Sequence, residues 1–138
     1  IESWGSVAES SSNNASSRVA NAETDVSFGG DRSDILLDTS GANQEITLYF
    51  QNTGIRPLDK SSFTIFVDGV SSSTTGAATL YPANGVWAPD YVLEVTVTDA
   101  SFNYADGDIA TVTIVAQSTI SEGVKGTDSE TAEVRLSV

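Results

Sequence analysis

The chain has 138 residues, enough for one domain with a real hydrophobic core. Its 19 acidic and 6 basic side chains give a formal net charge of −13, which argues against nucleic acid and anionic lipid as partners because both would repel it. The chain has no Cys, His or Met, so the usual ligands of zinc, copper and iron and every Ser-His or Cys-His nucleophile pair are missing. We therefore expect neither an enzyme nor a bound cofactor.

The composition also bears on habitat. Few lysines, many acids and small side chains in place of large apolar ones favour a high-salt environment, where salt screens a dense acidic surface. Plain solubility is the alternative explanation of the charge. No run of the chain approaches the ~20 apolar residues that a membrane-spanning helix needs.

The first 23 residues are rich in Ser, Asn and Ala. Ser and Asn side chains compete for backbone hydrogen bonds, so we expect a stalk or tail here, with a weak helix as the alternative. Asn14-Ala15-Ser16 matches the acceptor sequence for N-glycosylation and makes Asn14 a possible glycosylation site.

From residue 24 on, short apolar runs separated by turn residues predict strands. The clearest is 45–52, where Ile46, Leu48 and Phe50 share one face. The segments 70–76 and 121–130 are expected to be polar loops. The predicted strands are 25–28, 35–37, 45–52, 63–68, 77–81, 91–98, 109–117 and 131–138. About seven or eight short strands predict an all-β, immunoglobulin-like β-sandwich over residues 24–138, preceded by the stalk, residues 1–23.

Acidic pairs are the only candidates for a metal site. Asp106 and Asp108, or Asp31 and Asp34, could offer carboxylates to calcium. Asp-Gly-Asp is more typical of a tight turn, so we expect no metal. A paired-carboxylate hydrolase would need two acids facing each other across a cleft, which sequence alone does not place.

Three short motifs stand out. Asn52-Thr53-Gly54 ends one strand, Asp68-Gly69 turns the chain after the next, and Trp87-Ala88-Pro89 precedes the strand at 91–98. Trp87 has three interpretations: a cover over one end of the core, a landmark of a family, or an aromatic anchor at an interface. Phe102 and Tyr104 are expected to cap the core rather than to form an interface.

Together these motifs resemble the soluble domains of the archaellum stator proteins, the FlaF and FlaG families. The resemblance covers roughly residues 24–97, with Asn52, Thr53, Gly54, Asp68, Gly69, Trp87 and Pro89 as the matching positions. The chain departs from the family in a longer loop over 70–88 and in Asp90, which stands where a Gly follows the Pro.

The resemblance implies a non-enzymatic structural protein of the archaeal motility machinery. Family members carry a type IV pilin-like membrane helix before an outer sandwich. We therefore expect an extracytoplasmic, pseudo-periplasmic or cell-surface location, with the membrane reached only through an N-terminal helix that this chain lacks. The family implies self-association into a homo-oligomer and contact with the surface layer or other archaellum subunits.

Two other identities remain open. An archaellin or archaeal pilin also carries an outer β-domain, and a larger cell-surface protein could contain an adhesion or carbohydrate-binding sandwich. For the interface we expect an edge strand, 45–52 or 131–138, with apolar side chains near Trp87. The candidate interface residues are Leu48, Phe50, Trp87, Val134 and Leu136.

Overall fold

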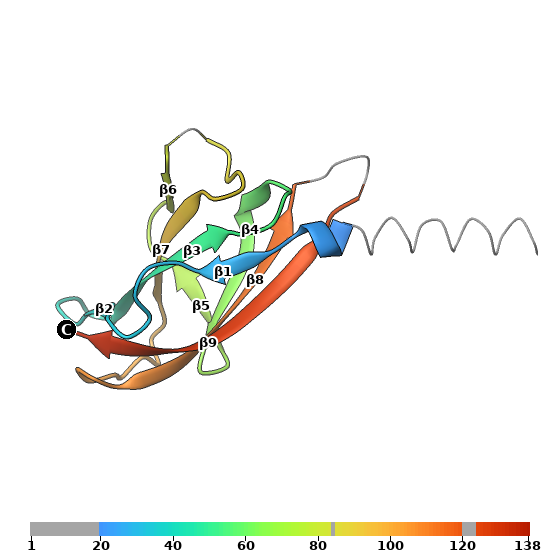
Figure 1. Ribbon diagram of the computed structural model, residues 1–138. Helices are drawn as coiled ribbons and strands as arrows, with labels where there is room; N and C mark the ends of the chain where they lie inside the picture. The colour runs from blue at the N-terminus through green and yellow to red at the C-terminus, as the bar shows by residue number, and fades with distance from the viewer. Residues whose placement is uncertain (1–19, 84, 120–123) are drawn as a thin grey trace, which may run out of the picture.

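The computed structural model describes residues 20–83, 85–119 and 124–138 (Figure 1). Within these residues the protein has nine β-strands preceded by one helical turn, residues 20–23, so the all-β prediction is confirmed. No helix in this part of the chain is long and apolar enough to cross a membrane. The strands are β1 (Val26–Phe28), β2 (Ile35–Asp38), β3 (Glu45–Asn52), β4 (Leu58–Val67), β5 (Val70–Thr74), β6 (Thr79–Tyr81), β7 (Val92–Thr98), β8 (Ile109–Ser118) and β9 (Thr127–Ser137).

Backbone pairing arranges the strands in two groups. In the first, β3 lies antiparallel to β1 and β7, and β7 also pairs with β6. In the second, β8 lies antiparallel to β4 and β9. Two strands join the groups: β2 pairs antiparallel with β3 and parallel with β9, while β5 pairs with β4 and, at its far end, with β7. The pairing therefore continues from one group into the other at both sides.

One hydrophobic core lies inside the strands, because alternate side chains of each strand point inward. The inward residues of β3 and β7 pair across the ladder, for example Leu48 with Val95. Trp87 is completely buried, and its indole N–H donates to the carbonyl oxygen of Tyr91 at 2.8 Å. The interpretation of Trp87 as a cover over the core is confirmed. The core residues of β3 and β8 are Ile46, Leu48, Phe50, Ala110, Val112, Ile114 and Ala116.

Phe102 and Tyr104 also cap the core. Phe102 is buried, Tyr104 packs against the core while half-buried, and their ring centroids lie 5.6 Å apart. The expectation for these two residues is confirmed.

Two stretches predicted as loops form strands. These are β5 and the first part of β9, residues 127–130, and both carry polar side chains on both faces. β5 forms because Asp68 and Gly69, with φ angles of 50° and 82°, reverse the chain directly after β4 and pair Val67 with Val70. β4 also begins five residues before the predicted start, at Leu58, with an irregular register between Leu58 and Phe63.

Candidate functional site

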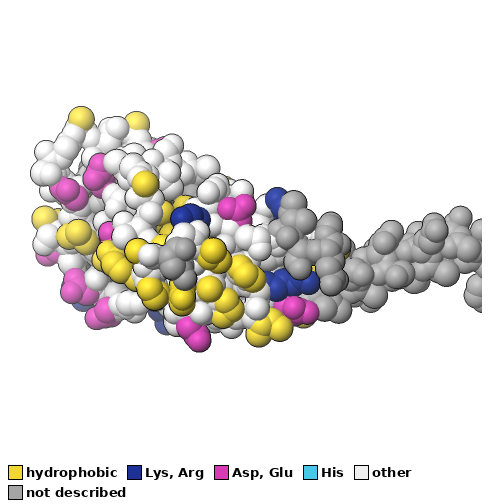
Figure 2. Space-filling model, turned by 90° about the horizontal axis from the view of Figure 1, so that it is seen from above, with side chains coloured by type: hydrophobic (Ala, Val, Ile, Leu, Met, Phe, Trp, Pro, Cys, Tyr) yellow, Lys and Arg dark blue, Asp and Glu magenta, His cyan; other side chains and the backbone are white. Residues whose placement is uncertain are grey.

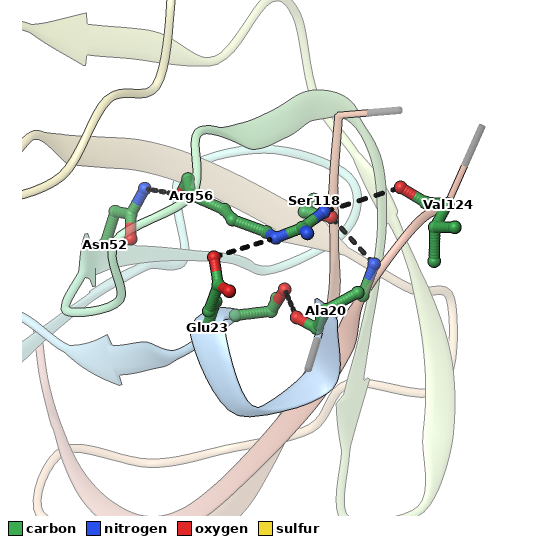
Figure 3. A network of polar contacts seen from close by, with 8 residues as sticks. Ala20, Glu23, Asn52, Arg56, Ser118 and Val124 are labelled. Carbon is green, nitrogen blue, oxygen red and sulfur yellow. Dashed lines mark hydrogen bonds and ion pairs between the residues drawn. The ribbon is translucent and has the colours of Figure 1, made fainter. Parts of the chain in front are cut away.

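Residues 20–25, the junction segment, lie against one end of the domain (Figure 3). The loop between β3 and β4 binds them on one side: Thr53 N donates to the Asp25 carbonyl at 3.1 Å and Ile55 N to the Glu23 carbonyl at 3.0 Å. On the other side, Thr127 N donates to Asn21 Oδ1 at 2.9 Å. The junction segment is thus held by two parts of the chain that are far apart in sequence.

An ion pair reinforces this contact. Arg56 Nε lies 3.3 Å from Glu23 Oε2, and the two side chains are only 17% and 31% exposed. Arg56 Nη1 also donates to the carbonyl oxygen of Val124 at 3.5 Å, which reaches toward the β8–β9 loop. Because the pair is largely covered, solvent and salt screen it less than they would a fully exposed pair.

Two glycines allow the backbones to approach this closely. A β-carbon at Gly54 would lie 2.5 Å from the Glu23 carbonyl oxygen, and one at Gly126 would overlap Thr24 Oγ1 and the carbonyl oxygen of Ala20. Ala20 is completely buried at this contact, and Thr24 Oγ1 donates to its carbonyl oxygen at 2.6 Å. Only glycine fits at both positions.

Asn52 organises the loop that receives the junction segment. Its Nδ2 donates to the carbonyl oxygens of Arg56, at 2.8 Å, and Trp87, at 3.0 Å, while its Oδ1 accepts from Gly54 N at 3.0 Å. Thr53 Oγ1 donates to Asp25 Oδ2 at 2.8 Å. The structure therefore brings the Asn52-Thr53-Gly54 motif and Trp87 together, beside the half-buried Pro89.

The third motif lies elsewhere. Asp68 and Gly69 form the turn between β4 and β5, where Asp68 Oδ1 accepts from Thr111 N at 2.8 Å and Oδ2 from the Tyr104 hydroxyl at 2.6 Å. Burial and the hydrogen bond to Asp68 raise the pKa of Tyr104 well above its ordinary value. These two residues stabilise a turn and do not contact the junction segment.

The boundary predicted after residue 23 differs from the structure. Ala20 is buried and Glu23 is ion-paired, so residues 20–23 belong to the packed domain rather than to a stalk. The predicted stalk up to residue 19, including Asn14, lies outside the described residues.

The five candidate interface residues need a correction. Leu48, Phe50, Trp87, Val134 and Leu136 are each at most 1% exposed and belong to the core cluster. The alternation places Leu48 with Phe50, and Val134 with Leu136, on one face of their strands, and that face points inward. Trp87 lies in the loop before β7 and is buried as well. Side chains buried in this way cannot contact a second folded copy.

The two strands predicted as open edges, β3 and β9, differ in how many neighbours they pair with. β3 is paired on both sides, with β7 on one and with β1 and β2 on the other, so the prediction that it is an open edge is wrong. β9 pairs with β8 from Thr127 to Arg135, but with β2 only at Leu136 and Ser137. In the described part of the chain, no strand pairs with the other side of β9 before Leu136.

Three carboxylates meet beside the junction segment. One oxygen from each of Asp25, Asp128 and Glu130 lies within 4.8 Å of the others, and all three residues are half-buried. Burial raises the pKa of Asp128, the hydrogen bond from Val26 N opposes the rise, and the nearby Asp25 carboxyl adds to it. Such a group could offer part of the oxygen shell of a calcium ion.

Three acids of the two predicted pairs bind backbone N–H groups instead. Asp31 Oδ1 accepts from Ser33 N at 2.9 Å, Asp106 Oδ1 from Val138 N at 2.9 Å and Asp108 Oδ2 from Ala105 N at 2.8 Å. The cluster at Asp25 could not be predicted from sequence, because Asp25 lies about a hundred residues before Asp128 and Glu130 and meets them only through the fold.

Some apolar side chains are exposed in the loop between β3 and β4 and in β6 with the loop that follows it. Ile55, Tyr81 and Val86 are large hydrophobic residues with much of their surface exposed. Figure 2 shows hydrophobic side chains collected on the face that carries the loop between β6 and β7.

A scan against models of known protein families finds no match to this chain, and a search of curated proteins finds none either.

Proposed function

We propose that this chain is the outer domain of a non-enzymatic structural protein of the archaellum, of the FlaF and FlaG type. In this role it anchors the motility machinery outside the membrane through contacts with copies of itself and with the surface layer. The single observation that carries the proposal is the junction: the family-like residues Asn52, Thr53 and Gly54 build the loop that receives the junction segment.

The order of strands supports an immunoglobulin-like sandwich. Such folds place two antiparallel sheets face to face with Greek-key connections. Here β3, β7 and β6 would form one sheet and β5, β4, β8 and β9 the other, with β1 beside the first and β2 parallel to β9 in the second. β1 would then belong to the first sheet, and β2 would connect the two sheets because it pairs with both β3 and β9.

The junction suits a protein that transmits force. A domain tethered by a loose linker can rotate freely and transmits little torque or tension. Here the segment before β1 is held by backbone hydrogen bonds, by the Arg56–Glu23 ion pair and by two glycine contacts. A force applied to the chain ahead of the junction segment would therefore act directly on the strands.

The experiment is deletion of the encoding gene in its host, followed by measurement of swimming and of filaments by electron microscopy. We expect cells that lose swimming and recover it with the wild-type gene, and purified filaments that lack this protein. Unchanged swimming would overturn the proposal. Purified filaments built from this chain would replace the anchor role by that of an archaellin or pilin.

A variant tests the junction itself. Complementation with Glu23→Gln should reduce swimming at an unchanged protein level, since it removes the ion pair with little change in shape. Lys60→Gln, which changes one charge at an exposed position, is the matched control. Full swimming with Glu23→Gln would show that a fixed junction is not needed.

A further inference from the structure

We propose that a cleft between the turn before β2 and strands β8 and β9 binds a carboxylate-bearing peptide segment of a partner protein. The cleft has a volume of about 500 Å³ and is lined by Arg32, Ser33, Ile109, Glu133, Val134 and Arg135. The inference rests on the proposed function and deepens it, because it names the chemistry of the partner.

The fold sets the two arginines side by side. Arg135 N donates to the carbonyl oxygen of Arg32 at 2.8 Å, which joins β9 to the turn that contains Arg32. Arg135 also pairs with Ile109 across the β8–β9 ladder. Its Nη2 lies 3.5 Å from the point where a β-carbon on Gly107 would stand, so the guanidinium extends over the turn before β8.

Neither guanidinium is neutralised within the described structure. The ion pair found there is Arg56 with Glu23, and Arg32 and Arg135 have none, although acids outnumber basic residues 19 to 6. The nearby acids accept hydrogen bonds from backbone N–H groups instead: Asp31 from Ser33, Asp106 from Val138 and Asp108 from Ala105. Glu133 also lines the cleft and forms no ion pair with either arginine in the described structure. Two free guanidiniums in one cleft match the planar, bidentate geometry of a carboxylate.

Apolar side chains beside the arginines favour a peptide over an inorganic anion. Ile109 is 57% and Leu36 56% exposed. Leu36 pairs with Ser137 and therefore shares the outer face of the sheet with Arg135. Arginine and exposed apolar groups together are typical of protein interfaces. An acidic residue flanked by apolar residues would satisfy both, whereas phosphate or sulfate would leave Leu36 and Ile109 in water.

The cleft lies at the end of the domain away from the junction segment. Ile109 and Ser118 are the two ends of β8, about 30 Å apart for ten residues of strand, and Ser118 bonds to Gly126 at the junction. Figure 1 shows β2 and the C-terminus at the end of the domain opposite the helical turn at residues 20–23. A partner can therefore reach the cleft without meeting the junction segment.

The test uses the peptide acetyl-Leu-Asp-Leu-amide, with acetyl-Leu-Asn-Leu-amide as its neutral counterpart, titrated into the ¹⁵N-labelled full chain and followed by NMR. We expect shifts at the amides of Ser33, Ile109 and Arg135, and weaker binding of the neutral peptide. The double variant Arg32→Gln and Arg135→Gln should weaken binding at least about tenfold. Lys60→Gln combined with Lys125→Gln removes the same charge elsewhere and should leave binding unchanged.

Several results would overturn the assignment. These are no detectable binding, equal affinity for the two peptides, shifts confined to other residues, or inorganic phosphate binding as tightly as the acidic peptide. A failure here with loss of swimming on gene deletion would leave the anchor role standing. Peptide binding with unimpaired swimming would overturn the role in the archaellum but not the cleft.

Discussion

Asp90 occupies a backbone position that glycine adopts more easily. Its φ angle is 70°, in the left-handed region where a β-carbon is strained, and its side chain is exposed. Asp90 N donates to the carbonyl oxygen of Asn52 at 2.7 Å, so the conformation is needed to connect Trp87 to β7. Asp90 is one of the two features, with the longer loop over 70–88, in which the chain departs from the family that it resembles.

We expect Asp90→Gly to stabilise the protein by about 0.5–1 kcal/mol, because relief of the strained φ outweighs the greater freedom of glycine in the unfolded chain. Urea denaturation would measure the free energy of unfolding. Asp68→Gly is the matched control: its φ is also positive, but its carboxylate binds Thr111 N and the Tyr104 hydroxyl, so this variant should lose stability. A destabilised Asp90→Gly would refute the strain argument.

The Asp128 carboxyl makes the folding stability depend on pH, and the direction of its pKa shift sets the sign of that dependence. Its pKa is raised above the ordinary value of 3.8 in the folded protein, so the folded state holds more protons than the unfolded one just above that pH. This contribution favours folding below pH 3.8 and is lost as the pH rises through the folded pKa. Asp128→Asn should therefore be more stable than the wild type at pH 7, with an advantage that shrinks toward pH 4.

Asp31→Asn should show the opposite sign. Hydrogen bonds from the Ser33 side chain and backbone lower the pKa of Asp31, so its charged form favours the folded state above pH 3.8. The variant should be less stable than the wild type at pH 7, and the difference should fade as the pH drops. Thermal denaturation of the three proteins from pH 3 to pH 8 measures both effects, and equal pH profiles would contradict them.

At the scale of elements, the strands with one buried face could be predicted and the others could not. β3 was predicted with its observed bounds because its buried and half-buried residues alternate along all of its length. β5 reads Val-Ser-Ser-Ser-Thr and has no such alternation; it exists because its turn and its two neighbours pair with it. β9 was recognised only from residue 131, since its first residues are polar throughout.

The junction was predicted even less well than the strands. The Asn52 motif is visible in the sequence, but no local pattern predicts that Glu23, Arg56 and Gly126 meet around it. The candidate interface failed for a related reason: alternation identifies the two faces of a strand but not how much of each face the other sheet covers. Both features depend on contacts between segments distant in sequence.

Gly126→Ala should loosen the junction segment. The added methyl group would collide with Thr24 Oγ1 and the carbonyl oxygen of Ala20, backbone and buried groups that cannot easily move. We expect a loss of about 1–3 kcal/mol in stability. In hydrogen exchange, the amides of Ile55 and Thr127, which bind the junction segment, should exchange faster.

Gly41→Ala is the control for this change. A β-carbon at Gly41 would have only an ordinary contact, 3.5 Å from the carbonyl oxygen of Asn43. Its stability should stay within about 0.5 kcal/mol of the wild type. If both variants behaved alike, the close approach at Gly126 would not be what holds the segment.

On the scale of the whole molecule, repulsion between acids opposes a well-closed fold. The strand pairing joins the two groups at both sides and surrounds one core, which favours the compact state. Against it stands the net charge of −13, while the described structure contains a single ion pair. Salt can therefore screen much repulsion in this protein while weakening little attraction.

The melting temperature should therefore rise with salt. Between about 0.01 M and 1 M NaCl the screening length falls from roughly 30 Å to 3 Å, so repulsion across the surface nearly disappears. We expect a rise of several degrees, at roughly 5 °C for each kcal/mol gained, measured by circular dichroism. KCl should act like NaCl if screening is the cause. A melting temperature that stayed constant or fell would mean that the attractive charge contacts outweigh the repulsion, and the acidic surface would then give no reason to expect a high-salt habitat.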